Sequence, residues 1–362
     1  MNILQLNLAR LHLEIKSEID EAISKIFDAS AFIGGKQVEE FEQSFSQLAG
    51  SQYCVSCANG TDALYIATKS LGIKPGDEVL VPAMSWVSTS EILSQSGARP
   101  IFVDIDPVSY CINPEKIIEN ITEKTVGIIP VHLYGHPADM GKIMKIATDY
   151  SLWVIEDCAQ AHLAEFNGTK VGTFGDMGTF SFFPGKNLGA VGDAGALITG
   201  RNDLAEFAGK YSNHGQVNKH AHEFDGINSR MDGVQAAILN VKIKHIKRWT
   251  KARCELAQKY TAGIDEKNVL AKPLVKQGAK HAWHLYSLLV EEPDKFQDML
   301  SKNGIASSRN YPQPLTRLKQ YKFKSWEDAN AMRLASHVVN IPMCPMLKDD
   351  EVDHILKVIS NA

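Results

Sequence analysis

Short, almost uninterrupted apolar runs alternate with helical patterns through the first two thirds of the chain. Clear examples are the runs at 79–83, 126–131 and 152–155, and the stretch 140–149 places its apolar residues at helical spacing. A strand with water on one face alternates polar and apolar residues, whereas a strand covered on both faces does not. The pattern therefore predicts an α/β fold with a large, mostly parallel sheet that is covered by helices.

The pattern changes after about residue 235. A single long helix is predicted over 234–264, and it leads into a segment with a strand and helices of its own. A chain of 362 residues is long enough for two hydrophobic cores. We predict a large domain over 14–250 and a smaller α/β domain over 251–362, with residues 1–13 joining the smaller one.

Composition argues against several kinds of partner. The formal net charge of −4 gives no general attraction to nucleic acid, and no apolar run is long enough to cross a membrane. The basic residues from Lys242 to Arg253 are expected to form the solvated face of the long helix. Cys54 and Cys57 lack the second pair of a zinc site, so no metal is predicted. The scattered cysteines fit a cytoplasmic protein with reduced thiols.

Several polar groups follow predicted strands, which is where sheets of this kind bind ligands. Residues 59–62 (Asn-Gly-Thr-Asp) lie between a strand and a helix, and the backbone N–H groups there suit a phosphate. The alternative is that Thr61 or Asp62 only caps the helix. Asp157 ends another buried strand, with Gln160 three residues later. Its carboxylate either caps a helix or holds a cationic nitrogen of a ligand.

Lys186 stands in an apolar, glycine-rich run, FSFFPGKNLGAVGDAGA. Burial would lower the pKa of its amine and make it a nucleophile. Ser181 precedes it on the same strand, and Trp86 follows another strand, either as a core residue or as a flat surface for an aromatic ring. A phosphate site, an aromatic surface, a carboxylate and a reactive amine together describe a site for pyridoxal 5'-phosphate (PLP).

The sequence resembles the nucleotide-sugar aminotransferases of the DegT/StrS family, which belong to the fold type I class of PLP-dependent enzymes. The segments that carry the resemblance are AFIGGKQVEEFE, NGTDAL, PGDEVLVPAMSWVST, GARPIFVDID, IIPVHLYGHPADM, VIEDCAQAH, FSFFPGKNLGAVGDAGAL and GINSRMDGVQAAIL. They extend over nearly the whole chain. The resemblance implies the fold type I architecture, a PLP cofactor in the large domain, and a homodimer whose subunits share their active sites.

The resemblance also implies roles for single residues, with Lys186 and Asp157 as the catalytic pair. The residues expected to bind the cofactor are Gly60, Thr61 and Ser181 at its phosphate, Trp86 against its ring face, Gln160 near its ring hydroxyl, Asp157 at its pyridine nitrogen, Lys186 at its aldehyde, and Asn228, which reaches the phosphate of the neighbouring subunit's cofactor. Arg230 and Tyr311 are expected to contact the substrate. Some relatives are dehydratases with histidine in place of the lysine, and Lys186 argues against that branch.

We therefore predict an aminotransferase that moves an amino group from an amino acid, with L-glutamate expected, to a nucleotide-linked ketosugar for a surface polysaccharide or a glycosylated metabolite. The run SFFPGKNLGAVGD is most similar to relatives that aminate a 3-keto sugar, and a 4-keto sugar is the alternative. Asn213 and Asn310 replace an arginine and a histidine that relatives often carry, which affects the substrate. Another PLP reaction, as in a dehydratase or racemase, and a non-catalytic regulatory or scaffolding protein of the same fold remain alternative interpretations.

Overall fold

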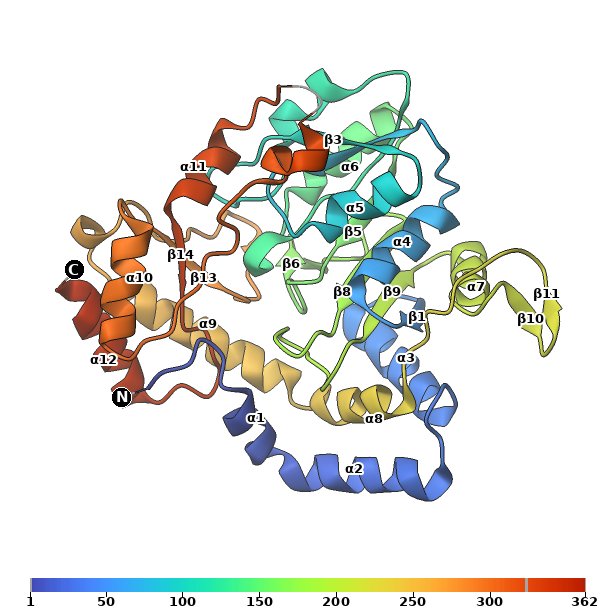
Figure 1. Ribbon diagram of the computed structural model, residues 1–362, viewed down its shortest axis with the longest axis horizontal. Helices are drawn as coiled ribbons and strands as arrows, with labels where there is room; N and C mark the ends of the chain where they lie inside the picture. The colour runs from blue at the N-terminus through green and yellow to red at the C-terminus, as the bar shows by residue number, and fades with distance from the viewer. Residues whose placement is uncertain (1, 323–324, 362) are drawn as a thin grey trace.

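One seven-stranded sheet organises the computed structural model, which describes residues 2–322 and 325–361 (Figure 1). In spatial order its strands are β1 (Tyr53–Cys57), β9 (Gly195–Thr199), β8 (Met177–Ser181), β5 (Trp153–Asp157), β4 (Thr125–Ile128), β2 (Glu78–Pro82) and β3 (Arg99–Val103). Strand β9 is antiparallel to β1 and β8, and the other neighbouring pairs are parallel. The predicted large, mostly parallel sheet is confirmed.

Helices α3 (Lys36–Ala49), α4 (Gly60–Ser70), α5 (Ser88–Gln95), α6 (Met140–Asp149) and α7 (Asn202–Tyr211) pack on this sheet. The other helices of this part of the chain are α1 (Leu8–Glu14), α2 (Lys16–Ala29), α8 (Gly233–Lys242) and α9 (Ile246–Gly263). Helix α4 packs on β8 and β9, whereas α3 packs on β1 and α8. The consecutive residues Val79, Leu80 and Val81 are all fully buried, which explains the unbroken apolar run of β2.

A smaller antiparallel sheet of β13 (Tyr286–Leu289) and β14 (Val338–Ile341) lies beside the chain termini, at the left of Figure 1. The helices of this region are α10 (Pro293–Lys302), α11 (Ala329–His337) and α12 (Asp349–Ser360). Its core joins Tyr286 and Ile355 to Tyr260 of α9 and to Ile3, whose backbone pairs with that of Ile305. The domain boundary near residue 250 stays a prediction.

The remaining elements are short. They are the strands β6 (Glu165–Phe166), β7 (Thr169–Lys170), β10 (Gln216–Asn218), β11 (Ala221–His222) and β12 (Ala279–Lys280), and the 3-10 helices η1 (Pro114–Lys116), η2 (Ile118–Asn120), η3 (Leu133–Gly135), η4 (Glu266–Asn268), η5 (Leu315–Arg317) and η6 (Lys319–Tyr321). Strands β10 and β11 form a hairpin that projects at the right of Figure 1. Across residues 2–322 and 325–361, no helix has the length and apolarity that a membrane span requires.

The predicted long helix is two helices, because the chain tightens between α8 and α9. Lys244 and His245 donate their backbone N–H groups to carbonyls only three residues back, which ends the α-helical pattern. The prediction of a solvated basic face is also wrong at both of its ends. Lys242 and Arg253 are 1% and 2% exposed, and they donate hydrogen bonds to the backbone carbonyls of Gly189 and Met343, respectively.

Candidate active site

Lys186 lies in the loop between β8 and β9, beyond the carboxyl end of β8. This loop folds back tightly, since the backbone N–H of Lys186 donates to the carbonyl of Phe183 at 2.8 Å. A Cβ on Gly189 would lie only 2.3 Å from the carbonyl oxygen of Pro184. The close approach of two backbone segments requires glycine and accounts for the glycine-rich sequence after the lysine.

Burial changes the protonation of both charged groups in this pocket. It lowers the pKa of Lys186 to about 8, although the negative charge of Asp157 acts in the opposite direction. It also raises the pKa of Asp157, which is 6% exposed, against the influence of its hydrogen bonds and of Lys186. The Lys186 amine is therefore uncharged in an appreciable fraction of molecules near pH 8, which is the condition for a nucleophile or a base.

The Asp157 carboxylate is held by two short-range contacts. Its Oδ1 accepts from the backbone N–H of Ala159 at 3.1 Å, and its Oδ2 accepts from the Thr89 hydroxyl at 3.2 Å. Residues 158–164 form turns, so no helix begins here and the interpretation as a helix cap is wrong. The carboxylate is a fixed, buried acceptor that can hold a cationic ligand nitrogen.

The amino end of α4 forms a second part of the pocket. Asn59 caps this helix, because its Oδ1 accepts from the backbone N–H of Asp62 at 2.8 Å; neither Thr61 nor Asp62 is the cap. A Cβ on Gly60 would lie 2.7 Å from the Cβ of Ser181, so glycine is needed for this contact. The first backbone N–H groups of α4 have no intrahelical partners and lie next to the Ser181 hydroxyl, which suits a phosphate.

Two aromatic residues from distant segments meet at the pocket. Trp86 is 59% exposed, so it is not a core residue, and its ring centre lies 5.7 Å from that of Tyr311. Gln160 donates from Nε2 to the Tyr311 hydroxyl at 3.0 Å and accepts the backbone N–H of Tyr134 at 2.7 Å. Gln160 thus holds Tyr311, a residue of the C-terminal region, in this part of the site. The exposed ring of Trp86 remains accessible to a ligand.

Asn228 and Arg230 do not join this group within one subunit. Both are exposed and flank the buried Ser229, whose hydroxyl donates to the Asp62 carboxylate at 2.6 Å. Arg230 donates to the side chain of Asn213 at 3.3 Å. In the part of the chain that the structure describes, the Asn228 side chain has no hydrogen-bond partner.

The sequence did not single out Ser88, Thr89 and Ser229. Thr89 bonds Asp157, Ser88 forms a 2.7 Å hydrogen bond with the Thr61 hydroxyl, and Ser229 ties its segment to the start of α4. Their position in the sequence was the available signal, because Ser88 and Thr89 stand two and three residues after Trp86. Ser229 likewise stands inside the GINSR segment.

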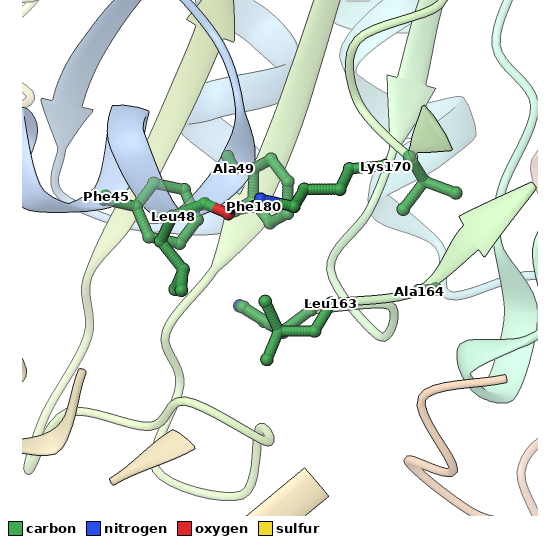
Figure 2. Close-up of a pocket in the computed structure, with 9 residues that line it drawn as sticks. Phe45, Leu48, Ala49, Leu163, Ala164, Lys170 and Phe180 are labelled. Carbon is green, nitrogen blue, oxygen red and sulfur yellow. Dashed lines mark hydrogen bonds between the residues drawn. The ribbon is translucent and has the colours of Figure 1, made fainter. Parts of the chain in front are cut away.

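A separate small cavity lies between α3 and the strand β8 (Figure 2). It is lined by Phe45, Leu48, Ala49, His162, Leu163, Ala164, Lys170, Val171 and Phe180. Because successive strand residues point to opposite faces, Phe180 places this cavity across β8 from Ser181. Its volume of about 10 Å³ holds a single water molecule at most, so it is not a cofactor site.

The residues around Lys186 fit PLP. The amine can bind an aldehyde, the buried carboxylate can hold a protonated ring nitrogen, and the cradle left by Gly60 beside Ser181 admits a phosphate at a helix amino terminus. A site of this kind at the carboxyl edge of a mostly parallel sheet defines a PLP-dependent enzyme. Residues 13–360 match the DegT/DnrJ/EryC1/StrS aminotransferase family, and the chain belongs to this family.

The chain is similar to other proteins over most of its length. The chain is 40% identical over 349 residues to the UDP-N-acetyl-3-dehydro-alpha-D-glucosamine 3-aminotransferase of Acidithiobacillus ferrooxidans, covering 95% of this chain and 94% of the relative. It is 38% identical to the "Pleiotropic regulatory protein" of Geobacillus stearothermophilus, covering 99% and 98%. The crystal structure of ntda from Bacillus subtilis with bound cofactor PMP superimposes with a TM-score of 0.91 at 32% identity, covering 99% and 85%. The cofactor of this family is PLP, as the sequence predicts.

Proposed function

We propose that this PLP-dependent aminotransferase takes an amino group from L-glutamate and delivers it to a 3-keto sugar linked to a nucleotide. The observation that carries the proposal is Lys186, an amine with a pKa of about 8 that shares a pocket with the buried Asp157 carboxylate. The substrate class rests on the relative from A. ferrooxidans, which is named for amination of a 3-dehydro UDP-sugar. A 4-keto sugar is the less favoured acceptor.

Besides Lys186, which would bind the aldehyde, five residues would hold PLP in the pocket. The phosphate would accept hydrogen bonds from the backbone N–H groups of Gly60 and Thr61 and from the Ser181 hydroxyl. Asp157 would keep a proton on the ring nitrogen, and the open face of Trp86 would cover the ring. When bound, PLP supplies a ring that withdraws electrons from the reacting carbon of the substrate. Asp157 makes that withdrawal stronger by stabilising the positive ring nitrogen.

Lys186 Nζ moves the protons of the reaction. In its uncharged form it removes the proton from the α-carbon of the amino donor, and in its charged form it returns a proton during product formation. The reverse sequence at the sugar carbon uses the same amine. A pKa of about 8 allows both forms to be present near neutral pH, as a group that must accept and donate requires.

We further propose a homodimer with shared sites. Trp86, Phe183 and Val191 are exposed by 59%, 55% and 45%, and the last two stand three residues before and five residues after Lys186. Exposed apolar side chains that lie together mark surfaces that bind a partner. A second copy that covers them would bring its Asn228 to the phosphate and its Arg230 to the substrate. The six unpaired cysteines fit a reducing compartment, and we place the protein in the cytoplasm.

The test combines spectroscopy and turnover. The protein loaded with PLP is mixed with L-glutamate, and release of one 2-oxoglutarate per site is the expected result. The resulting amino form of the enzyme is then offered UDP- and dTDP-linked 3-keto and 4-keto sugars. Amination of a 3-keto sugar supports the proposal. A regulatory protein is the second candidate, because one relative carries that name; PLP binding without 2-oxoglutarate release would favour it.

A further inference from the structure

Asn187, which directly follows Lys186, is anchored to a distant segment of the chain. Its side chain is 5% exposed, donates from Nδ2 to the backbone carbonyl of Ala282 at 2.9 Å, and places Oδ1 3.1 Å from Nδ1 of His284. A backbone carbonyl can only accept, so the amide nitrogen must face Ala282 and the amide oxygen must face His284. His284 Nδ1 therefore carries a proton and donates it to Asn187.

His284 is itself fixed in place and uncharged. Its backbone N–H donates to the carbonyl of Tyr134 at 2.9 Å, and its own carbonyl accepts from Arg253 at 3.5 Å. Burial, together with the positive charge of Lys186, lowers the pKa of His284 well below its usual value. With its proton on Nδ1 and no positive charge, the ring keeps one tautomer across the physiological pH range.

Further hydrogen bonds connect His284 to Tyr311 through Tyr134 and Gln160. Tyr134 accepts from His284 through its carbonyl and donates through its N–H to Gln160, which in turn holds the Tyr311 hydroxyl. One chain of hydrogen bonds therefore joins the residue beside Lys186 to the residues over the opposite side of the pocket. Such a connected network of hydrogen bonds ties the two sides of the pocket to each other.

We propose that His284 and Asn187 are positioning residues for Lys186, holding the backbone after the reactive amine so that Nζ stays inside the pocket. This inference rests on the proposed function, because it takes Lys186 as the group that binds PLP. Neither residue is assigned a chemical step. Without the contact, the loop after Phe183 would lose its attachment to the 281–285 segment, and the lysine could turn outward to water.

A test by pH dependence requires knowing which groups near the Lys186 amine change their charge. The groups that face Lys186 are Asp157 on β5, His162 in the turn after it, His284, and Arg253 behind the histidines. Burial lowers the pKa of His162 to about 3, so both histidines stay neutral above pH 6. Burial also lowers the pKa of Arg253 to about 10 and that of Lys242, which donates to Gly189 in the loop after Lys186, to about 8. Covalent capture of PLP still reports on Lys186, because the amine that forms the bond must itself be uncharged.

The experiment measures covalent capture of PLP by the full-length, cofactor-free protein as a function of pH, followed by absorbance. Only the uncharged amine reacts, so the capture rate of the unmodified protein should rise with a midpoint of about 8. His284→Gln moves the amide beyond the Nδ1 position and should slow capture about tenfold, with a midpoint displaced toward 10.5. His284→Asn puts an amide N–H where Nδ1 stands and should restore the rate and the midpoint.

Two further measurements distinguish a failure of this inference from a failure of the proposed function. Asn187→Leu breaks the same contact from the other side and should reproduce the slow capture, even where a His284 variant fails to fold by circular dichroism. An unchanged midpoint in folded His284→Gln or Asn187→Leu protein overturns the inference. Borohydride reduction followed by peptide mass mapping locates the captured PLP. Attachment at a lysine other than Lys186 overturns the proposed function itself.

Discussion

Lys186 and Asp157 form an opposite-charge pair whose partners are each pushed toward the neutral form by burial, while their attraction favours the charged forms. This balance gives the amine its pKa of about 8 instead of 10.5. Lys186→Ala should abolish 2-oxoglutarate release, because it removes both the PLP attachment and the proton carrier. Lys116→Ala, at an exposed surface ion pair, is the control and should retain full turnover. Measurable transamination by folded Lys186→Ala protein would contradict the assignment.

Asp157 permits a sharper test, because the chain also contains an aspartate that does cap a helix. Asp157→Asn keeps the shape but loses the charge that holds a proton on the ring nitrogen, so we expect about a thousandfold loss of kcat. In Asp139→Asn the new amide oxygen can still cap α6 at Lys142. This control should therefore show normal kinetics. Similar kcat values for the two variants would reduce Asp157 to a local structural role.

Among the elements, β5 is held to the following loop by Glu156, one residue before Asp157. Glu156 is fully buried and accepts backbone N–H groups from Gly172, Phe174 and Gly175 at 2.7–2.9 Å. His132 Nε2 lies 3.1 Å from the same carboxylate. The side chains of Glu156, His132 and Cys158 are close enough to suggest a metal site. The hydrogen bonds already occupy both carboxylate oxygens, so the cluster is explained as a structural clamp.

If Glu156 is such a clamp, replacing it should lower the stability of the protein. Glu156→Gln replaces one acceptor oxygen by an amide nitrogen that faces other donors, and we expect a loss of about 3 kcal/mol in the free energy of unfolding. Urea denaturation followed by tryptophan fluorescence measures it. Glu119→Gln breaks only an exposed ion pair with Lys116 and should cost about 0.5 kcal/mol or less. Equal stability of the two variants would show that Glu156 contributes little.

The sequence predicted correctly those elements that are marked by residues close together in the chain. The buried strands and the pocket residues at their ends, such as Asp157 and Ser181, could be predicted because burial on both faces leaves an apolar run and the polar residue follows it. The break between α8 and α9 could not, since no glycine or proline marks it. The contact of Asn187 with His284 was also out of reach, because it joins residues 97 positions apart.

For the whole molecule, the residues of the site come from both parts of the chain. Tyr311 reaches it from the C-terminal region, whereas Trp86 and Phe183 expose more than half of their surface. Asn228, exposed and unpartnered within the described residues, stands on the segment that Ser229 fastens to α4. The exposed rings of Trp86 and Phe183, together with the free amide of Asn228 on a fixed segment, fit the proposed shared site of a homodimer.

The proposed shared site makes a prediction that distinguishes it from a site formed within one subunit. Asn228→Ala should weaken PLP binding by about 1.5–3 kcal/mol, the range for a hydrogen bond to a charged group. Mixing Asn228→Ala subunits with Lys186→Ala subunits then separates the two models. In the heterodimer, the site that owns an intact Lys186 receives an intact Asn228 from its partner, so its PLP affinity, measured by equilibrium titration, should return to the unmodified value. If the affinity stays as weak as in the Asn228→Ala homodimer, Asn228 acts within its own subunit and its exposure has another cause.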